Sequence, residues 1–347
     1  MPPKPRLLAL ASTYVALFIA SGCQEPPAPE RPLTASPSER AQEACVSRSH
    51  RDVPYAGDAR TRLDVHLPLV PRDQPVPWVL WVHGGGWAGG NKQSVELFAL
   101  RQTCRGFAVA TIDYRLSFEA RFPAPLADLR AALRHLRAHA DDYDLDPDKV
   151  VVWGASAGGH LAALLALTEG EKAFDRPDDR HRKVSTAVRG VIDWWGPSSF
   201  SEFDADFGLR CPQHKCHTCE GSAESRLLGC EVRRCAPRAR RASPLTYVKP
   251  HAPPFLLQHG RDDCTVPAAQ SQRLAEALRA AGNDVQLEII PGARHGDGAW
   301  LRPDVMAAVD GFLDRRLGRA PLSQTPLPVP QAWRAPRVPA QPKTLLR

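Results

Sequence analysis

Residues 150–168 read VVVWGASAGGHLAALLALT, and the expected architecture follows from this stretch. The run 150–153 is apolar throughout, which is typical of a strand buried on both faces of a parallel sheet. Residues 158–168 are small and apolar, and they predict a helix that buries most of its surface. A serine between such a strand and such a helix lies on a tight turn, with its hydroxyl above the edge of the sheet. We therefore predict that Ser156 is a nucleophile; the alternative is a serine that caps the helix.

The alternation of apolar runs and helical patterns continues on both sides of this stretch. Apolar runs of strand length occupy 78–82, 107–112, 188–195, 255–258 and 285–290, and helical spacing occupies 128–140, 268–281 and 303–317. Strands that alternate with helices indicate a parallel sheet covered on both faces. The prediction is an α/β fold with a mostly parallel central sheet. The 347 residues suffice for one catalytic domain with appendages.

Three consecutive glycines directly follow the strand predicted at 78–82. They belong to His83-Gly84-Gly85-Gly86-Trp87, where backbone N–H groups can turn into an open pocket. Together with the N–H of Ala157, such donors would hold the oxyanion of a tetrahedral intermediate. A phosphate-binding loop would need a Gly-Lys-Ser/Thr sequence after the glycines, and this sequence lacks one. The glycines therefore predict an oxyanion hole rather than a plain flexible turn.

A serine nucleophile needs a general base and a carboxylate that orients this base. In folds of this kind the chain order is serine, then acid, then histidine. His295 is the last histidine in the chain and lies in a turn-rich loop after the strand at 285–290. Asp262 and Asp263 follow the strand at 255–258. The residues alone therefore assign the base to His295 and leave the acid as one of two neighbouring aspartates.

Four segments, in their order along the chain, resemble the esterase and lipase group of α/β-hydrolases. They are HGGGW at 83–87, GASAGG at 154–159, HGRDDCTVP at 259–267 and GARHG at 292–296. The resemblance is strongest to bacterial feruloyl- and acetyl-esterase-like enzymes and to the hormone-sensitive-lipase group. It implies that the acid is Asp263 and that Gly85 and Gly86 supply oxyanion donors. It also implies hydrolysis of a carboxylic ester, which needs neither a metal nor another cofactor.

Two other functions are compatible with these motifs. A peptidase of the prolyl-oligopeptidase kind shares the triad and its order, but such enzymes usually carry a large propeller domain, and 82 residues precede His83. A non-catalytic binding module is the second alternative, although every triad position is filled here. Trp87, Trp194 and Trp195 are candidates for lining an acyl or aromatic pocket, or else for packing in the core.

The N-terminal residues 1–23 resemble an export signal. They combine early positive charges with an apolar run that ends in Ala20-Ser21-Gly22-Cys23, similar to a bacterial lipobox. This predicts an exported protein that a lipid on Cys23 attaches to a membrane. Because Ala20 stands where leucine is usual, secretion without a lipid is the alternative. Export favours extracellular substrates, such as small-molecule esters or acyl groups linked to polysaccharides.

Composition divides the remaining chain into three parts. Residues 24–50 predict a proline-rich tether, 51–317 the catalytic domain, and 318–347 a disordered proline-rich tail.

The net charge of +7 includes one basic cluster, formed by Arg233, Arg234, Arg238, Arg240 and Arg241. Neither a recognition helix nor an aromatic-interleaved strand accompanies this cluster, so we predict a solvated face and no nucleic-acid partner.

Nine cysteines fit the oxidising compartment that an export signal predicts. With Cys23 set aside, eight remain, and about 105 pairings of eight cysteines are possible, so the connectivity stays open. Five of the nine lie in residues 208–235, where the sequence departs from the family pattern. We predict a small disulfide-stapled cap over the active site there, with Cys264 as a candidate partner. The alternative, zinc at Cys216-His217-Thr218-Cys219, lacks a second half-site.

Overall fold

The structure is a computed structural model that describes residues 45–69, 74–94, 97–208 and 211–318. The predicted signal peptide with Cys23, most of the tether at 24–50 and nearly all of the tail at 318–347 lie outside the described residues. Within these ranges, no helix is both long enough and apolar enough to cross a lipid bilayer.

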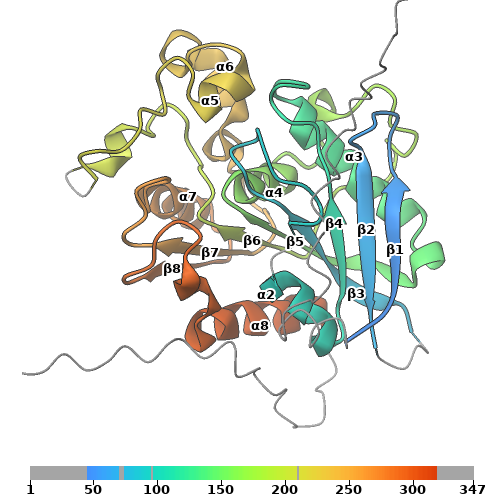
Figure 1. The fold of residues 1–347 in the computed structure, drawn as a ribbon. Coiled ribbons are helices and arrows are strands. Elements are labelled where there is room, and N and C mark those ends of the chain that lie inside the picture. Colours follow the sequence, from blue (N-terminus) through green and yellow to red (C-terminus); the bar gives the residue numbers. More distant parts are fainter. Residues whose placement is uncertain (1–44, 70–73, 95–96, 209–210, 319–347) are drawn as a thin grey trace, which may run out of the picture. The chain divides into compact units, whose positions relative to one another are not determined.

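Eight strands form one sheet in the order β1-β2-β4-β3-β5-β6-β7-β8 (Figure 1). The pairs from β4 to β8 are parallel, whereas β2 runs antiparallel to both of its neighbours. The strands are β1 (Val46–Pro54), β2 (Arg62–Pro68), β3 (Val76–Val82), β4 (Ala108–Ile112), β5 (Leu145–Ala155), β6 (Gly190–Trp194), β7 (Phe255–Gly260) and β8 (Val285–Ile290). This sheet confirms the predicted α/β fold.

Helices cover both faces of the sheet (Figure 1). One face carries α3 (Ala124–Ala138), α4 (Ala157–Leu167) and α7 (Ala269–Ala280), and the other α2 (Leu97–Leu100) and α8 (Pro303–Leu317). Two further helices are α5 (Ala223–Leu228) and α6 (Ala236–Ala242). Short 3-10 helices in the described ranges are η1 (Arg101–Arg105), η2 (Asp141–Tyr143), η3 (Lys172–Phe174), η4 (Ala205–Phe207), η5 (Val232–Arg234), η6 (Pro244–Tyr247) and η7 (Gly298–Leu301).

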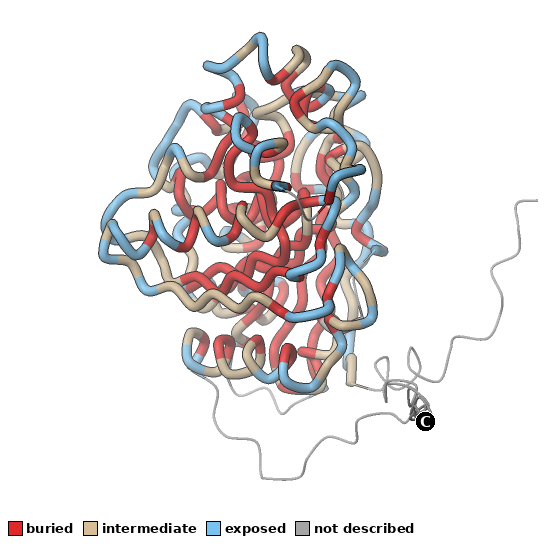
Figure 2. Tube along the Cα trace, turned by 90° about the vertical axis from the view of Figure 1, so that its left-hand side faces the viewer, coloured by how far each residue is buried: buried red, intermediate tan, exposed pale blue. Residues whose placement is uncertain are grey.

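Strand β3 illustrates how the sheet divides the hydrophobic core. Trp78, Leu80 and Val82 pack in the cluster that includes α3, α4 and α7, while Val79 and Trp81 pack in the cluster that includes α8. Successive side chains of a strand point to opposite faces, and here both faces are covered. The inner strands therefore read as continuous apolar runs. Figure 2 shows buried residues along the strands and exposed residues on the outer turns.

The edge strand β1 is a difference from the sequence prediction. It begins at Val46, so the last residues of the predicted tether at 24–50 pair with β2. Its residues are partly buried or exposed, and Cys45 immediately before it forms a disulfide with Cys104. Because none of its residues is fully buried, the strand has no apolar run that would separate it from the tether in the sequence.

Candidate active site

Ser156 occupies a one-residue turn between β5 and α4. Its φ of +55° and ψ of −120° lie in a region that residues other than glycine rarely adopt. Such strain persists only where the surrounding structure holds it, and it is common at functional sites. Close packing beneath the turn requires a glycine, because a Cβ at Gly158 would lie 2.0 Å from the carbonyl oxygen of Val82. The turn thus presents the serine at the carboxyl end of β5.

The side chains of Ser156, His295 and Asp263 form a continuous chain of two hydrogen bonds. Ser156 Oγ donates to His295 Nε2 over 3.0 Å, and His295 Nδ1 donates to Asp263 Oδ2 over 2.7 Å. The serine follows β5, the aspartate follows β7 and the histidine follows β8. Because these strands are parallel, their carboxyl ends meet at one edge of the sheet. Three residues far apart in the chain therefore converge there.

The two neighbouring aspartates lie in different surroundings. Asp263 is 3% exposed, whereas the side chain of Asp262 lies on the surface. The second carboxylate oxygen of Asp263 accepts hydrogen bonds from the backbone N–H groups of Thr265 (2.8 Å) and Val266 (3.0 Å). These bonds orient the carboxylate toward His295. Of the two candidates for the acid, the structure brings Asp263 to the histidine.

Asp263 is held in its charged form. Burial on its own would raise the pKa of this carboxyl group, but hydrogen bonds from His259 and His295 outweigh burial and bring the pKa well below its usual range. His259 Nε2 lies 3.4 Å from Asp263 Oδ2 and also bonds to the carbonyl oxygen of Val266 at 2.8 Å. His259 stands in the same segment as the aspartate but is not among the predicted site residues.

The glycine loop lies directly beside the serine. Gly85, Gly86 and Ala157 line the same cavity as Ser156. Gly85 has a φ of +104°, and a Cβ there would lie 2.4 Å from the carbonyl oxygen of Gly89, so a side chain is excluded. The backbone can thus bring its amides close to the serine without a side chain in between.

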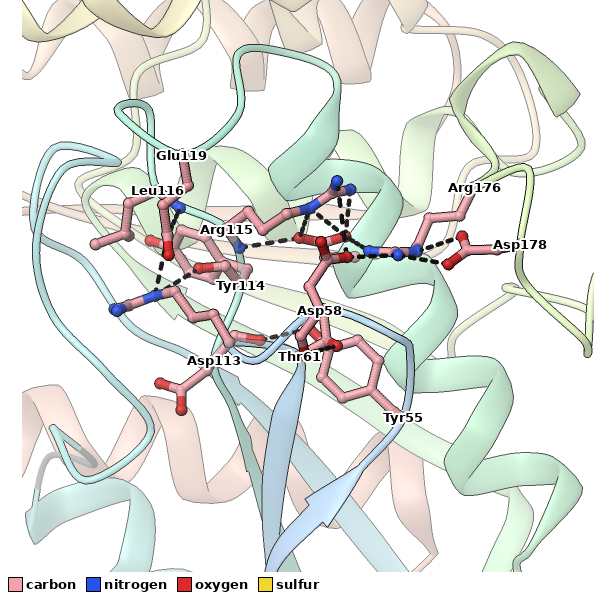
Figure 3. A network of polar contacts seen from close by, with 12 residues as sticks. Tyr55, Asp58, Thr61, Asp113, Tyr114, Arg115, Leu116, Glu119, Arg176 and Asp178 are labelled. Carbon is pink, nitrogen blue, oxygen red and sulfur yellow. Dashed lines mark hydrogen bonds and ion pairs between the residues drawn. The ribbon is translucent and has the colours of Figure 1, made fainter.

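Figure 3 shows a polar network around Tyr114 and Arg115, which follow β4. Tyr114 donates a hydrogen bond to the carbonyl oxygen of His83 (2.9 Å), and the two rings stack at 4.2 Å. The next residue, Arg115, binds the fully buried carboxylate of Asp128 through two bonds of 2.8 and 2.9 Å, and Arg176 binds the same carboxylate. Removing one partner of a buried ion pair typically costs about 3–5 kcal/mol. The network therefore holds the residues that follow β4 against the glycine loop.

Two of the three candidate pocket tryptophans line the cavity next to the serine. This cavity has a volume of about 460 Å³, and Trp87 and Trp195 contribute to its wall. Trp195 has its ring centroid 5.8 Å from that of His295. Trp194, by contrast, packs in the core on the α8 side of the sheet, where its indole N–H donates to Gln258 over 2.6 Å. Trp194 thus takes the alternative place in the core, whereas Trp195, which stacks on it at 5.1 Å in the same hydrophobic cluster, also reaches the cavity.

The eight cysteines of the described ranges form four disulfides. They are Cys45–Cys104, Cys211–Cys264, Cys216–Cys219 and Cys230–Cys235. The bond to Cys264 fastens the Cys-rich segment to the residue next to Asp263, as the sequence analysis suggested. The pairing of Cys216 with Cys219 consumes the two thiols that a zinc half-site would need.

The Cys-rich segment at 208–235 also supplies one wall of the cavity. His217, Ala223 and Glu224 lie in this wall. His217 Nδ1 donates to Glu224 Oε1 over 2.9 Å, and its ring stacks on Phe203 at 4.1 Å. In the sequence, the spacing around His217 suggests only a zinc ligand, and Glu224 is not among the predicted site residues. Their approach to Ser156 depends on how the segment folds back, which no local pattern reveals.

Proteins of similar sequence include esterases. Residues 63–278 match the BD-FAE family. Esterase LipC of Mycobacterium tuberculosis is 30% identical over 282 residues, which cover 78% of this chain and 67% of that protein. The probable isoprenylcysteine alpha-carbonyl methylesterase ICMEL1 of Arabidopsis thaliana is 28% identical over 275 residues, which cover 76% of this chain and 54% of that protein. The matches thus span about half to two thirds of these relatives.

Two solved structures resemble this chain, and the first is an esterase. A truncated carbohydrate esterase from gut microbiota superimposes with a TM-score of 0.73 at 26% identity, covering 80% of this chain and 99% of that one. A bifunctional GH43-CE protein of Bacteroides eggerthii has a TM-score of 0.69 at 30% identity, covering 78% of this chain and 35% of that one. The chain therefore belongs to the BD-FAE family of carboxylic ester hydrolases with the α/β-hydrolase fold.

Proposed function

We propose that this protein hydrolyses carboxylic esters by acyl transfer to Ser156. The observation that supports this proposal is the hydrogen-bonded chain Ser156–His295–Asp263. As Oγ attacks the ester carbonyl, His295 Nε2 takes the serine proton, and the carboxylate of Asp263 stabilises the resulting imidazolium. The oxyanion of the tetrahedral intermediate accepts hydrogen bonds from backbone N–H groups, for which we propose Gly85, Gly86 and Ala157.

The second half of the reaction uses the same groups. When the intermediate collapses, the alcohol leaves with the proton from His295, and the acyl group stays on Ser156. A water molecule then attacks the acyl-enzyme and gives its proton to His295. Collapse of the second intermediate releases the carboxylic acid and returns the proton to the serine. The two halves together consume one water molecule and return Ser156 and His295 to their starting protonation states.

For the substrate, we propose an acyl group esterified to a carbohydrate. One solved relative is a carbohydrate esterase. The cavity wall contains the polar pair His217 and Glu224, and the side chain of His217 is the more exposed of the two. Sugar hydroxyls can form hydrogen bonds with a polar group of this kind in a binding cavity. An exported protein, which residues 1–23 predict, would meet such esters outside the cell.

A substrate panel tests both parts of this proposal. We expect turnover of p-nitrophenyl acetate and of acetylated xylo-oligosaccharides, with little or no cleavage of peptide p-nitroanilides. The variant His217→Leu should lower kcat/KM for the acetylated sugars by about tenfold, the value of one hydrogen bond to the substrate, and spare p-nitrophenyl acetate.

Each part of the panel has an outcome that would contradict the proposal. Preferred cleavage of the anilides would favour the peptidase alternative over the esterase. An equal effect of His217→Leu on both esters would contradict the carbohydrate proposal and leave ester hydrolysis intact. His251→Asn serves as the matched control, because His251 is an exposed histidine with a positive φ, which asparagine tolerates.

A further inference from the structure

Three histidines form a cluster that the proposed reaction does not use. His135 lies in the last turn of α3, His139 directly follows this helix, and His181 lies in the loop between η3 and β6. One ring nitrogen of each histidine lies within 4.8 Å of the others. All three residues are partly buried, so their rings remain accessible from solvent.

The cluster lies at the opposite end of the sheet from Ser156. The chain passes from His139 through one 3-10 turn into the start of β5 at Leu145, and Ser156 follows the other end of this strand. Between Leu145 and Gly154, β5 runs beside the six residue steps of β3 from Val76 to Val82. At about 3.3 Å per residue, β5 therefore separates the two sites by roughly 20 Å. A cation at the cluster would therefore not touch the reacting groups.

The loop that carries His181 is held against α3 by ionic and hydrogen bonds. Arg134 on α3 contacts Asp179 (3.0 Å) and donates to the carbonyl oxygen of Val184 (2.8 Å). The N–H of His181 donates to Asp179 over 2.8 Å. Asp179 and Val184, which make these contacts with Arg134, lie on either side of His181 in the sequence. The contacts keep its ring next to the two helix histidines before any ligand arrives.

The helix histidines are also oriented. The N–H of His139 donates to the carbonyl oxygen of His135 (3.0 Å), so the two residues keep the helical spacing that places side chains on one face. His139 Nδ1 is bonded to Asp142 at 3.0 Å, the type of contact that fixes the ring of a metal-binding histidine. The C-terminal end of a helix such as α3 also favours a positive charge.

We propose that His135, His139 and His181 bind one Zn²⁺ or a similar divalent first-row cation. Imidazole nitrogens suit such ions, whereas Mg²⁺ and Ca²⁺ prefer oxygen ligands. Zn–N bonds of about 2.0–2.1 Å in a tetrahedral array place the nitrogens about 3.4 Å apart, and their spacing in this structure is at most 4.8 Å. The fourth position would take a water molecule. The ion would join the loop at 175–189 to α3.

Calorimetry on untagged, chelator-treated protein tests this site with ZnCl₂ as the probe. We expect one Zn²⁺ per chain with a Kd of about 10 μM or tighter. His139→Ala and His181→Ala should each weaken binding at least about tenfold and should abolish the rise in Tm that Zn²⁺ produces in the native protein. His251→Asn should bind Zn²⁺ like the native chain.

Further measurements distinguish Zn²⁺ binding at the three histidines from Zn²⁺ binding elsewhere on the protein. Turnover of p-nitrophenyl acetate by His139→Ala and His181→Ala shows that these variants are folded. His295→Ala should keep the Zn²⁺ site, and loss of Zn²⁺ binding in that variant would assign the metal to the active site and overturn the proposal. A Kd above about 100 μM for the native protein, or unchanged binding in the double variant His139→Ala/His181→Ala, would also overturn it.

Discussion

Replacing His295 by alanine is expected to lower kcat for p-nitrophenyl acetate by at least about three orders of magnitude. Ser156 Oγ then loses the acceptor that lies 3.0 Å away, and the attacking oxygen keeps its proton. The side chain of His295 is 21% exposed at the mouth of the site, so its removal leaves no cavity in the core. We expect the circular dichroism spectrum and the Tm to remain close to those of the native protein.

The control for this variant is His251→Asn, which removes a histidine from the surface and should keep the native kcat. A folded His295→Ala protein with more than a tenth of the native kcat would show that another group takes the serine proton. A Tm well below that of the native protein would instead show that His295 also stabilises the fold.

The two neighbouring aspartates should respond very differently to substitution by asparagine. Asp263→Asn removes the charge that faces His295 Nδ1 but keeps an oxygen that can accept the N–H groups of Thr265 and Val266. We expect a loss of about 10³–10⁴-fold in kcat, as for other triads in which an amide replaces the acid, with the fold preserved. Asp262→Asn alters an exposed side chain and should change kcat by less than about threefold.

This pair of variants differs by one position in the chain, so expression and handling are matched. Steady-state kinetics on p-nitrophenyl acetate supply the comparison, and thermal unfolding checks that both proteins are native. A larger loss for Asp262→Asn would mean that the loop after β7 presents the other carboxylate to the histidine in solution.

Features that depend on a few neighbouring residues could be predicted from the sequence. The apolar run before Ser156 and the small residues after it predict a strand, a turn and a helix, and β5 and α4 lie there. The continuous apolar runs predict strands covered on both faces, and β3 is such a strand. His295 followed from chain order, because it is the last histidine in the sequence.

Features that depend on distant residues could not be derived in the same way. The partner of Cys264 was a suggestion only, because disulfide connectivity reflects the folded path of the Cys-rich segment. Trp194 and Trp195 are chemically alike and adjacent, and both pack in the same core cluster, but only Trp195 also lines the cavity. His135 and His139 show helical spacing in the sequence, but only the folded loop brings His181 to them.

Labelling with a fluorophosphonate tests the central claim, an activated serine at position 156, most directly. The native protein should incorporate one label per chain, and peptide mapping should locate it on Ser156. Ser156→Ala should take up no label, and His295→Ala should react far more slowly, because the hydroxyl has lost its base. A label on another residue, or full ester turnover by folded Ser156→Ala protein, would contradict the account.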